Sequence, residues 1–180
     1  MRSMLGLLLL LAFTLLFSGC ARWNLFRRAH TKQECETGLC IGKKTPDLDG
    51  MDFAGQPLKL SDYRGKVVVV SFWASGCGPC RAMIPHEREL VERYRGKPFA
   101  LLGVNNDENP DAARRVIAAH NISWPNLKTR GENDPLNKRW GIEFWPSIFV
   151  IDRQGVLRYK NVRGAHLDNA IETLLKEPAR

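Results

Sequence analysis

Several features that define other classes of protein are absent from this 180-residue sequence. It has no internal repeat, no low-complexity tract and no long block of Lys and Arg, since the basic residues are scattered along the chain. The formal net charge of +8 therefore comes without a nucleic-acid-binding motif, and we expect no nucleic-acid partner. The 44% hydrophobic and 26% charged residues indicate one globular domain with an appendage.

Long apolar runs are scarce, and the one that is present lies near the start of the chain. It covers residues 5–17, and 13 residues in a helix span only about 20 Å of a hydrocarbon core that is about 30 Å thick. We therefore expect no membrane-spanning helix here. Preceded by the basic start Met1-Arg2-Ser3, the run fits the apolar region of a signal peptide, which we predict over residues 1–19.

The predicted signal peptide is followed by a cysteine, in the sequence Ser18-Gly19-Cys20. This boundary resembles the lipobox of bacterial lipoproteins, in which the signal is cut before a cysteine that then carries the lipid. We therefore expect a lipoprotein anchored to a membrane through Cys20, on the periplasmic side of the cell envelope. Phe17 differs from the aliphatic residue usual at its position, which leaves the alternative of an ordinary signal peptide with an incidental Cys20.

Cysteine is sparse, and its count of five is odd, which needs an explanation in an exported protein. If Cys20 is acylated, the other four form two local pairs, Cys35–Cys40 and Cys77–Cys80, and disulfides persist outside the cytoplasm. Cys35 and Cys40 could instead supply zinc ligands or a redox relay. We favour a structural disulfide and expect no metal, because this pair has a different spacing and precedes the folded domain.

Apolar periodicity predicts a tether over residues 20–44 and one α/β domain over residues 45–177. The predicted strands are 67–73, 99–104 and 147–151, with an antiparallel return over 156–162 and a short hairpin over 53–60. The predicted helices follow Cys80, begin at Asn109-Pro110 and carry the apolar stripe of residues 167–175. Helices between the early strands indicate βαβ crossovers and hence a partly parallel sheet.

The chemistry of the chain is concentrated in Cys77-Gly78-Pro79-Cys80, where a buried strand is followed by a helix. Free N–H groups at a helix start lower the pKa of a thiol there. We therefore predict that Cys77 is the exposed nucleophile and that Cys80, one turn further on, is the resolving thiol. Pro79 suits the first helical turn, where its missing N–H needs no partner. Trp73 is expected to shield the site.

Two segments carry a resemblance to a known family. They are residues 72–81, which read Phe-Trp-Ala-Ser-Gly-Cys-Gly-Pro-Cys-Arg and are followed by Pro85, and residues 141–152, which contain Trp145-Pro146. Over about residues 45–177 the sequence resembles the thioredoxin superfamily, and within it the TlpA/ResA-like extracytoplasmic thiol-disulfide oxidoreductases. The resemblance implies a thioredoxin-like α/β fold, with a central mixed sheet flanked by helices and an N-terminal hairpin.

The resemblance also implies a substrate site. Pro146 would be cis and face the Cys77–Cys80 disulfide, and the main chain of Trp145 would pair with a bound substrate chain in β fashion. Trp73, Gly78 and Pro79 would complete the surface that binds the substrate.

The activity implied is disulfide exchange with exported proteins, without a cofactor. Gly-Pro between the cysteines resembles the reducing thioredoxins, which favours a reductant. By family analogy, apocytochrome c is one candidate substrate, so that the role would lie in cytochrome c maturation, and a membrane thiol-disulfide electron donor would recharge the site.

Two positions depart from the family pattern. Many thioredoxins have a buried Asp where this chain has Ser71, and many ResA-like proteins have a Glu where it has Met83. Both acids are thought to move the proton of the resolving thiol. Without a nearby carboxylate, we expect resolution to be slow at neutral pH, unless a water or Glu143 accepts the proton.

Two other functions compete with the oxidoreductase. A peroxiredoxin would need Pro and Thr where this chain has Val70 and Ala74, which argues strongly against it. A non-catalytic or metal-chaperone module of thioredoxin-like fold is the second alternative. Copper proteins of that kind typically separate their cysteines by three residues and place a Pro next, whereas this chain has two residues and Arg81.

Overall fold

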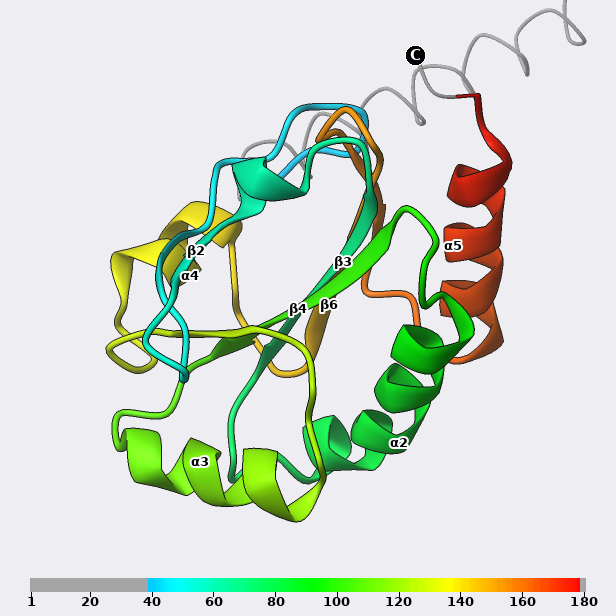
Figure 1. The fold of residues 1–180 in the computed structure, drawn as a ribbon. Helices are drawn as coiled ribbons and strands as arrows, with labels where there is room; N and C mark the ends of the chain where they lie inside the picture. The colour runs from blue at the N-terminus through cyan, green and yellow to red at the C-terminus, as the bar shows by residue number, and fades with distance from the viewer. Residues whose placement is uncertain (1–38, 179–180) are drawn as a thin grey trace, which may run out of the picture. The chain divides into compact units, whose positions relative to one another are not determined.

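A computed structural model describes residues 39–178, and these fold around a mixed five-stranded sheet of order β5-β4-β3-β6-β7 (Figure 1). A separate antiparallel hairpin is formed by β1 and β2. The bounds are β1 Asp49–Met51, β2 Pro57–Lys59, the 3-10 helix η1 Leu60–Tyr63, β3 Val67–Trp73, α2 Gly78–Arg93, β4 Phe99–Asn105, α3 Pro110–Ala119, β5 Asn126–Lys128, α4 Pro135–Trp140, β6 Ser147–Ile151, β7 Leu157–Lys160 and α5 Ala165–Lys176. Within residues 39–178, no helix is long and apolar enough to cross a membrane.

The central strand β3 is buried along its whole length. It runs parallel to β4, through the crossover helix α2, and antiparallel to β6. Its four consecutive valines suit this position, because β-branched side chains pack well on both faces of a covered sheet. Both the strand and the βαβ crossover predicted from the sequence are confirmed, and so is the thioredoxin-like fold.

The side chains of β3 alternate between two cores, as the period of a strand requires. Val67 and Val69 pack with apolar residues of α2 and α5, which lie on one face of the sheet (Figure 1). Val68, Val70 and Phe72 pack on the opposite face against the hairpin, η1 and α4. In that second core the rings of Phe72, Trp140 and Phe149 lie with centroids 5.2–5.7 Å apart.

Three parts of the fold differ from the expectations. The hairpin is present, but its first strand is Asp49–Met51, so the predicted bounds of 53–60 are displaced. The Asp52 carboxylate accepts hydrogen bonds from Ala54 N and Gln56 N and thus stabilises the turn between the two strands. The elements β5 and α4 are additional, because short polar elements have no clear apolar period.

Residues 39–44, which the sequence analysis placed in the tether, contact the domain in the structure. Leu39 is buried in the core that contains α4, and Lys44 forms a β-bridge with Val156. The amide of Gly42 donates to the carbonyl of Leu157 over 2.7 Å. Ordered sequence therefore begins at least six residues before the predicted boundary at residue 45.

Candidate active site

The two cysteines of the motif lie at the start of α2 and are joined by a disulfide, with a Cα–Cα distance of 5.3 Å. Cys77 is the N-cap residue, and its Sγ accepts a hydrogen bond of 3.1 Å from Cys80 N. The Cys77 side chain is partly exposed, whereas Cys80 is only 4% exposed. Gly78 and Pro79 lie exposed between them. This order of exposure agrees with the roles predicted for the two thiols.

The loop that joins β3 to Cys77 is fixed by Asp107. The backbone N–H of Ser75 donates to both carboxylate oxygens, over 3.0 and 3.1 Å, and its hydroxyl donates to one of them. Asn105 Nδ2 donates to the same carboxylate over 2.8 Å. Asp107 thus positions the chain just before the nucleophile. The sequence analysis did not identify Asp107, although polar residues that directly follow a buried strand were a usable signal.

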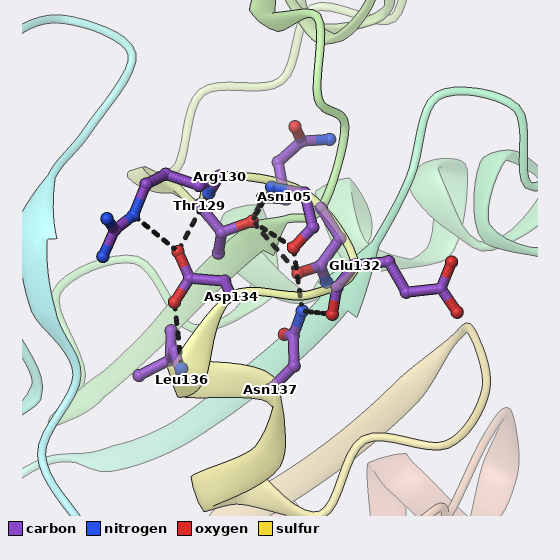
Figure 2. Close-up of polar contacts among 9 residues, drawn as sticks. Asn105, Thr129, Arg130, Glu132, Asp134, Leu136 and Asn137 are labelled. Carbon is purple, nitrogen blue, oxygen red and sulfur yellow. Dashed lines mark hydrogen bonds and ion pairs between the residues drawn. The ribbon is translucent and has the colours of Figure 1, made fainter.

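A second polar cluster lies between β5 and α4, at the carboxyl end of β4 (Figure 2). Thr129 Oγ1 donates to the carbonyl of Asn105 over 2.9 Å. Asn137 Nδ2 donates to the carbonyls of Gly131 and Glu132, and Asp134 caps α4 by accepting from Leu136 N. These contacts connect the start of α4 to Asn105, whose side chain binds Asp107.

Trp73, the last residue of β3, is buried beside the disulfide in a cluster with Cys80 and Ala113. Its indole Nε1 donates to Asn126 Oδ1 over 2.8 Å, and Asn126 Nδ2 donates to the carbonyl of Trp124. The neighbouring residue on β4 is Gly103, where any Cβ would collide with the Asn126 side chain. A glycine is therefore required there for Asn126 to bind Trp73.

The peptide bond between Trp145 and Pro146 is cis, as predicted. Pro146 is buried and lines the same small cavity as Cys80, and its carbonyl accepts a hydrogen bond of 2.6 Å from Arg163. Trp145 is partly exposed and Phe144 is 50% exposed. The predicted roles of Trp145 and Pro146 in substrate binding remain predictions.

A buried carboxyl group, that of Glu87, lines the same cavity as Cys80 and Pro146. The cavity has a volume of about 10 Å³ and is lined by Ser71, Trp73, Cys80, Met83, Ile84, Glu87, Ile122, Trp124, Asn126 and Pro146. Glu87 is only 5% exposed. Burial raises the pKa of Glu87 to about 7, against the smaller lowering effects of a hydrogen bond with Ser71 and the charge of His86.

The expectation that Cys80 has no nearby carboxylate is therefore wrong. The expectation was based on positions 71 and 83, where the family has acids and this chain has Ser and Met. The signal that it missed is a glutamate in the buried stripe of α2, since Cys80, Ile84, Glu87 and Leu90 are the buried residues of that helix. Glu143, the candidate considered instead, is exposed and is not among the residues that line the cavity.

His86, which precedes Glu87 on α2, does not line the cavity. His86 Nε2 is 3.0 Å from Asp168 Oδ1 on α5, so its ring is engaged in a contact between helices. Cys20 and Cys35 lie outside the described residues, so lipidation and the Cys35–Cys40 disulfide stay predictions. Among residues 39–178, no cluster of three or more His, Cys, Asp or Glu side chains could hold a metal ion.

A thioredoxin-like fold that places a Cys-Gly-Pro-Cys disulfide at a helix start, opposite a cis-proline, defines a thiol-disulfide oxidoreductase. The chain belongs to the AhpC/TSA family, whose model matches residues 41–160.

Individual relatives agree with this class. Thiol-disulfide oxidoreductase ResA of Bacillus cereus is 26% identical over 163 residues, with 91% of each sequence covered. A solved structure named as a thiol:disulfide interchange protein DsbE, from Chlorobium tepidum, is 31% identical with a TM-score of 0.70, covering 77% of this chain and 99% of that one. The thioredoxin domain of a Bacteroides vulgatus thiol-disulfide oxidoreductase has a TM-score of 0.72 at 26% identity, covering 77% of this chain and all of that domain.

The buried carboxyl of Glu87 predicts an unusual dependence of stability on pH. Because the pKa of Glu87 is raised in the folded state, from 4.5 to about 7, the folded protein holds a proton that the unfolded chain loses between these values. The free energy of unfolding should therefore fall as the pH rises from about 4.5 to 7, by as much as about 3 kcal/mol. Glu87→Gln removes this fall, because glutamine does not ionise.

Urea unfolding of the disulfide-bonded protein at several pH values measures the effect. The matched control is Glu89→Gln, on the exposed side of the same helix. The free-energy difference between Glu87→Gln and wild type should grow with pH, whereas the curve for Glu89→Gln should run parallel to the wild-type curve. If the curve for Glu87→Gln also ran parallel to the wild-type curve, the raised pKa of a buried Glu87 would be contradicted.

Proposed function

We propose that this protein is a membrane-anchored thiol-disulfide oxidoreductase of the cell envelope that reduces disulfides in exported proteins. The observation that carries the proposal is the pairing of a partly exposed Cys77 at a helix start with a buried Cys80, beside cis-Pro146. Only one of the two sulfurs is open to a protein substrate, which is what a two-step exchange requires.

The proposed reaction begins with the Cys77 thiolate, since the thiolate is the nucleophile in disulfide exchange. The helix N-terminus stabilises this anion, and Cys80 N already donates to Cys77 Sγ in the disulfide form. Attack on a substrate disulfide gives a mixed disulfide and releases one substrate thiolate. Cys80 then attacks Cys77 Sγ, forms the Cys77–Cys80 bond and releases the second thiolate, so that two electrons pass to the substrate.

The segment before β6 is suited to binding an extended chain. Among the described residues, no main-chain hydrogen bond involves the amide or carbonyl of Trp145. Both groups are therefore available to pair with a substrate strand. The half-exposed ring of Phe144 adjoins them and offers an apolar contact to the same chain. This arrangement favours an unfolded or extended protein segment as the substrate.

Whether such a site reduces or oxidises its substrate depends on how strongly its own reduced, dithiol form is stabilised. Strong oxidants of this class are oxidising because their reduced, thiolate form is stabilised. Here Cys80 is buried, which disfavours its thiolate, and none of the residues that line the cavity beside it is cationic. The Cys77 thiolate gains stabilisation from the helix N-terminus, whereas Cys80 gains none from its surroundings. Support for a reductant therefore comes from Cys80 and from the Gly-Pro pair between the cysteines.

The cellular setting of the proposal rests on the N-terminal sequence. A lipid on Cys20 would anchor the domain to a membrane, with residues 21–38 as the tether, on the periplasmic side. A membrane thiol-disulfide electron donor would return the Cys77–Cys80 pair to the reduced state after each turnover. Exported proteins are the proposed substrates, and apocytochrome c is one candidate by analogy with the family.

Single-cysteine variants test the exchange mechanism. With insulin as the disulfide substrate, Cys77→Ser should abolish exchange, because no exposed thiolate remains. Cys80→Ser should still attack and should accumulate a mixed disulfide between Cys77 and an insulin chain, which peptide mass spectrometry identifies. Equal residual turnover in the two variants would contradict the assigned roles.

Cell fractionation tests the anchor. Cys20→Ala should move the protein from the membrane fraction to the soluble fraction and leave its rate of insulin reduction unchanged, because Cys20 is the predicted lipid site. Mass spectrometry of the wild-type protein should find lipid on Cys20. A wild-type Cys20 without lipid, together with unchanged fractionation of the variant, would refute the anchor.

A further inference from the structure

We propose that Glu87 is the proton acceptor for Cys80 in the resolving step of disulfide exchange. This inference rests on the proposed function. It assigns the role of proton acceptor to a residue outside positions 71 and 83, where the family has its acids and this chain has Ser and Met. It stands on the position of Glu87 on α2, on the cavity that Glu87 shares with Cys80, and on the absence of another ionisable group facing that cavity.

The geometry of α2 places both side chains on one face. Seven residues separate Cys80 from Glu87, which is about two helical turns, so the two side chains point in nearly the same direction. Helical side chains also lean toward the N-terminus of their helix, which directs the carboxyl of Glu87 back toward Cys80. Both side chains are buried against the sheet, with exposed fractions of 4% for Cys80 and 5% for Glu87.

The cavity connects the two groups. Its volume of about 10 Å³ is close to the lower limit for holding one water molecule, and its wall contains the polar side chains of Ser71 and Asn126. In the proposed step, a proton passes from the Cys80 thiol to the Glu87 carboxylate through a single water in this cavity. The Ser71 side chain lines the same cavity from β3, at the position where many thioredoxins have an Asp, and its interaction with the carboxyl lowers the pKa of Glu87.

Among the described residues that line the cavity, Cys80 and Glu87 are the only ionisable side chains. Each element around the cavity contributes neutral side chains: β3 has Ser71 and Trp73, the segment before β5 has Ile122 and Trp124, and Pro146 precedes β6. On α2 itself, Met83 and Ile84 are apolar. The charge of the neighbouring His86, whose ring lies 3.0 Å from the Asp168 carboxylate of α5, lowers the pKa of Glu87.

The acid strength of Glu87 suits the task. Burial raises its pKa to about 7, so both the carboxylate and the acid are populated near neutral pH. A general base is most effective when its pKa lies near the working pH, because it then accepts and releases the proton with similar ease. A solvated carboxylate with an ordinary pKa would be a much weaker acceptor for a thiol proton.

The resolving step conserves protons and electrons. The Cys80 proton passes to the Glu87 carboxylate while Cys80 Sγ attacks Cys77 Sγ in the mixed disulfide. The Cys77–Cys80 bond forms, the bond between Cys77 and the substrate sulfur breaks, and the substrate leaves as a thiolate with the electron pair. Glu87 then releases its proton to solvent. The dithiol of the enzyme is oxidised and the substrate disulfide is reduced by two electrons.

An aromatic disulfide separates the two chemical steps in one experiment. Reduced full-length protein is mixed in a stopped-flow instrument with 5,5′-dithiobis(2-nitrobenzoate), whose thiolate product is coloured. Attack by Cys77 releases the first coloured thiolate, and resolution by Cys80 releases the second. The first phase reports the proposed function, and the second phase reports the proton transfer. The signal of Cys77→Ser is subtracted as the background from other thiols.

Glu87→Gln should leave the first phase unchanged and slow the second about 100-fold or more at pH 7, as expected for loss of a general base. In the wild type, the second phase should rise to about pH 7 and then level off. In Glu87→Gln it should keep rising through the alkaline range, because Cys80 must lose its proton unaided. The control Glu89→Gln, exposed on the same helix, should match the wild type in both phases.

Restoring a carboxylate provides a second variant. Met83 lines the same cavity, so Met83→Glu in the Glu87→Gln background should recover much of the second phase near neutral pH. Identical second phases in wild type and Glu87→Gln from pH 6 to 9 would overturn the proposal, as would equal slowing of both phases. A wild-type protein without a first phase would contradict the proposed function itself, and the role of Glu87 would fall with it.

Discussion

Burial of β3 on both faces is the constraint on which the rest of this structure depends. The strand lies between β4 and β6, and its alternate side chains enter the two cores. Its carboxyl end therefore has a fixed position, and the loop held by Asp107 leads from that end to Cys77. The nucleophile is exposed because it caps α2, whereas Cys80, one turn further on, is covered by Trp73 and Pro146.

The same burial determines the chemistry of the site. Removal of water from around Cys80 disfavours its thiolate and protects it from other reactants, but it also makes the loss of its proton difficult. Glu87 is desolvated by the same packing, and Ser71 of β3 lines the cavity beside it. Burial destabilises the charged form of Glu87 and so raises the pKa of its carboxyl. The raised pKa makes Glu87 a better acceptor for the proton of Cys80. The cost to stability and the proposed catalytic role thus have one cause.

Local sequence signals were sufficient for much of this architecture. The valine run predicts β3 with its observed bounds, Asn109 caps α3 as expected, and Trp145-Pro146 indicates the cis peptide bond. The short elements β5 and α4 escaped prediction because neither is long enough to show an apolar period. Pairing with the distant β4 defines β5, and the cap provided by Asp134 defines the start of α4. Glu87 escaped for a different reason: its place in the apolar stripe of α2 was a usable signal, but the family pattern directed attention to positions 71 and 83.

The central claim is that the reducing Cys77–Cys80 pair is coupled to the buried carboxyl of Glu87. The most direct test is to measure the reduction potential of this pair as a function of pH. Wild-type protein and Glu87→Gln are equilibrated with thiol-disulfide buffers from pH 5 to 9. We predict a wild-type potential at pH 7 near roughly −270 mV, as in reducing thioredoxins, with a change of slope near pH 7 that is absent in the variant. A potential near roughly −120 mV, or curves of the same shape for both proteins, would contradict the account.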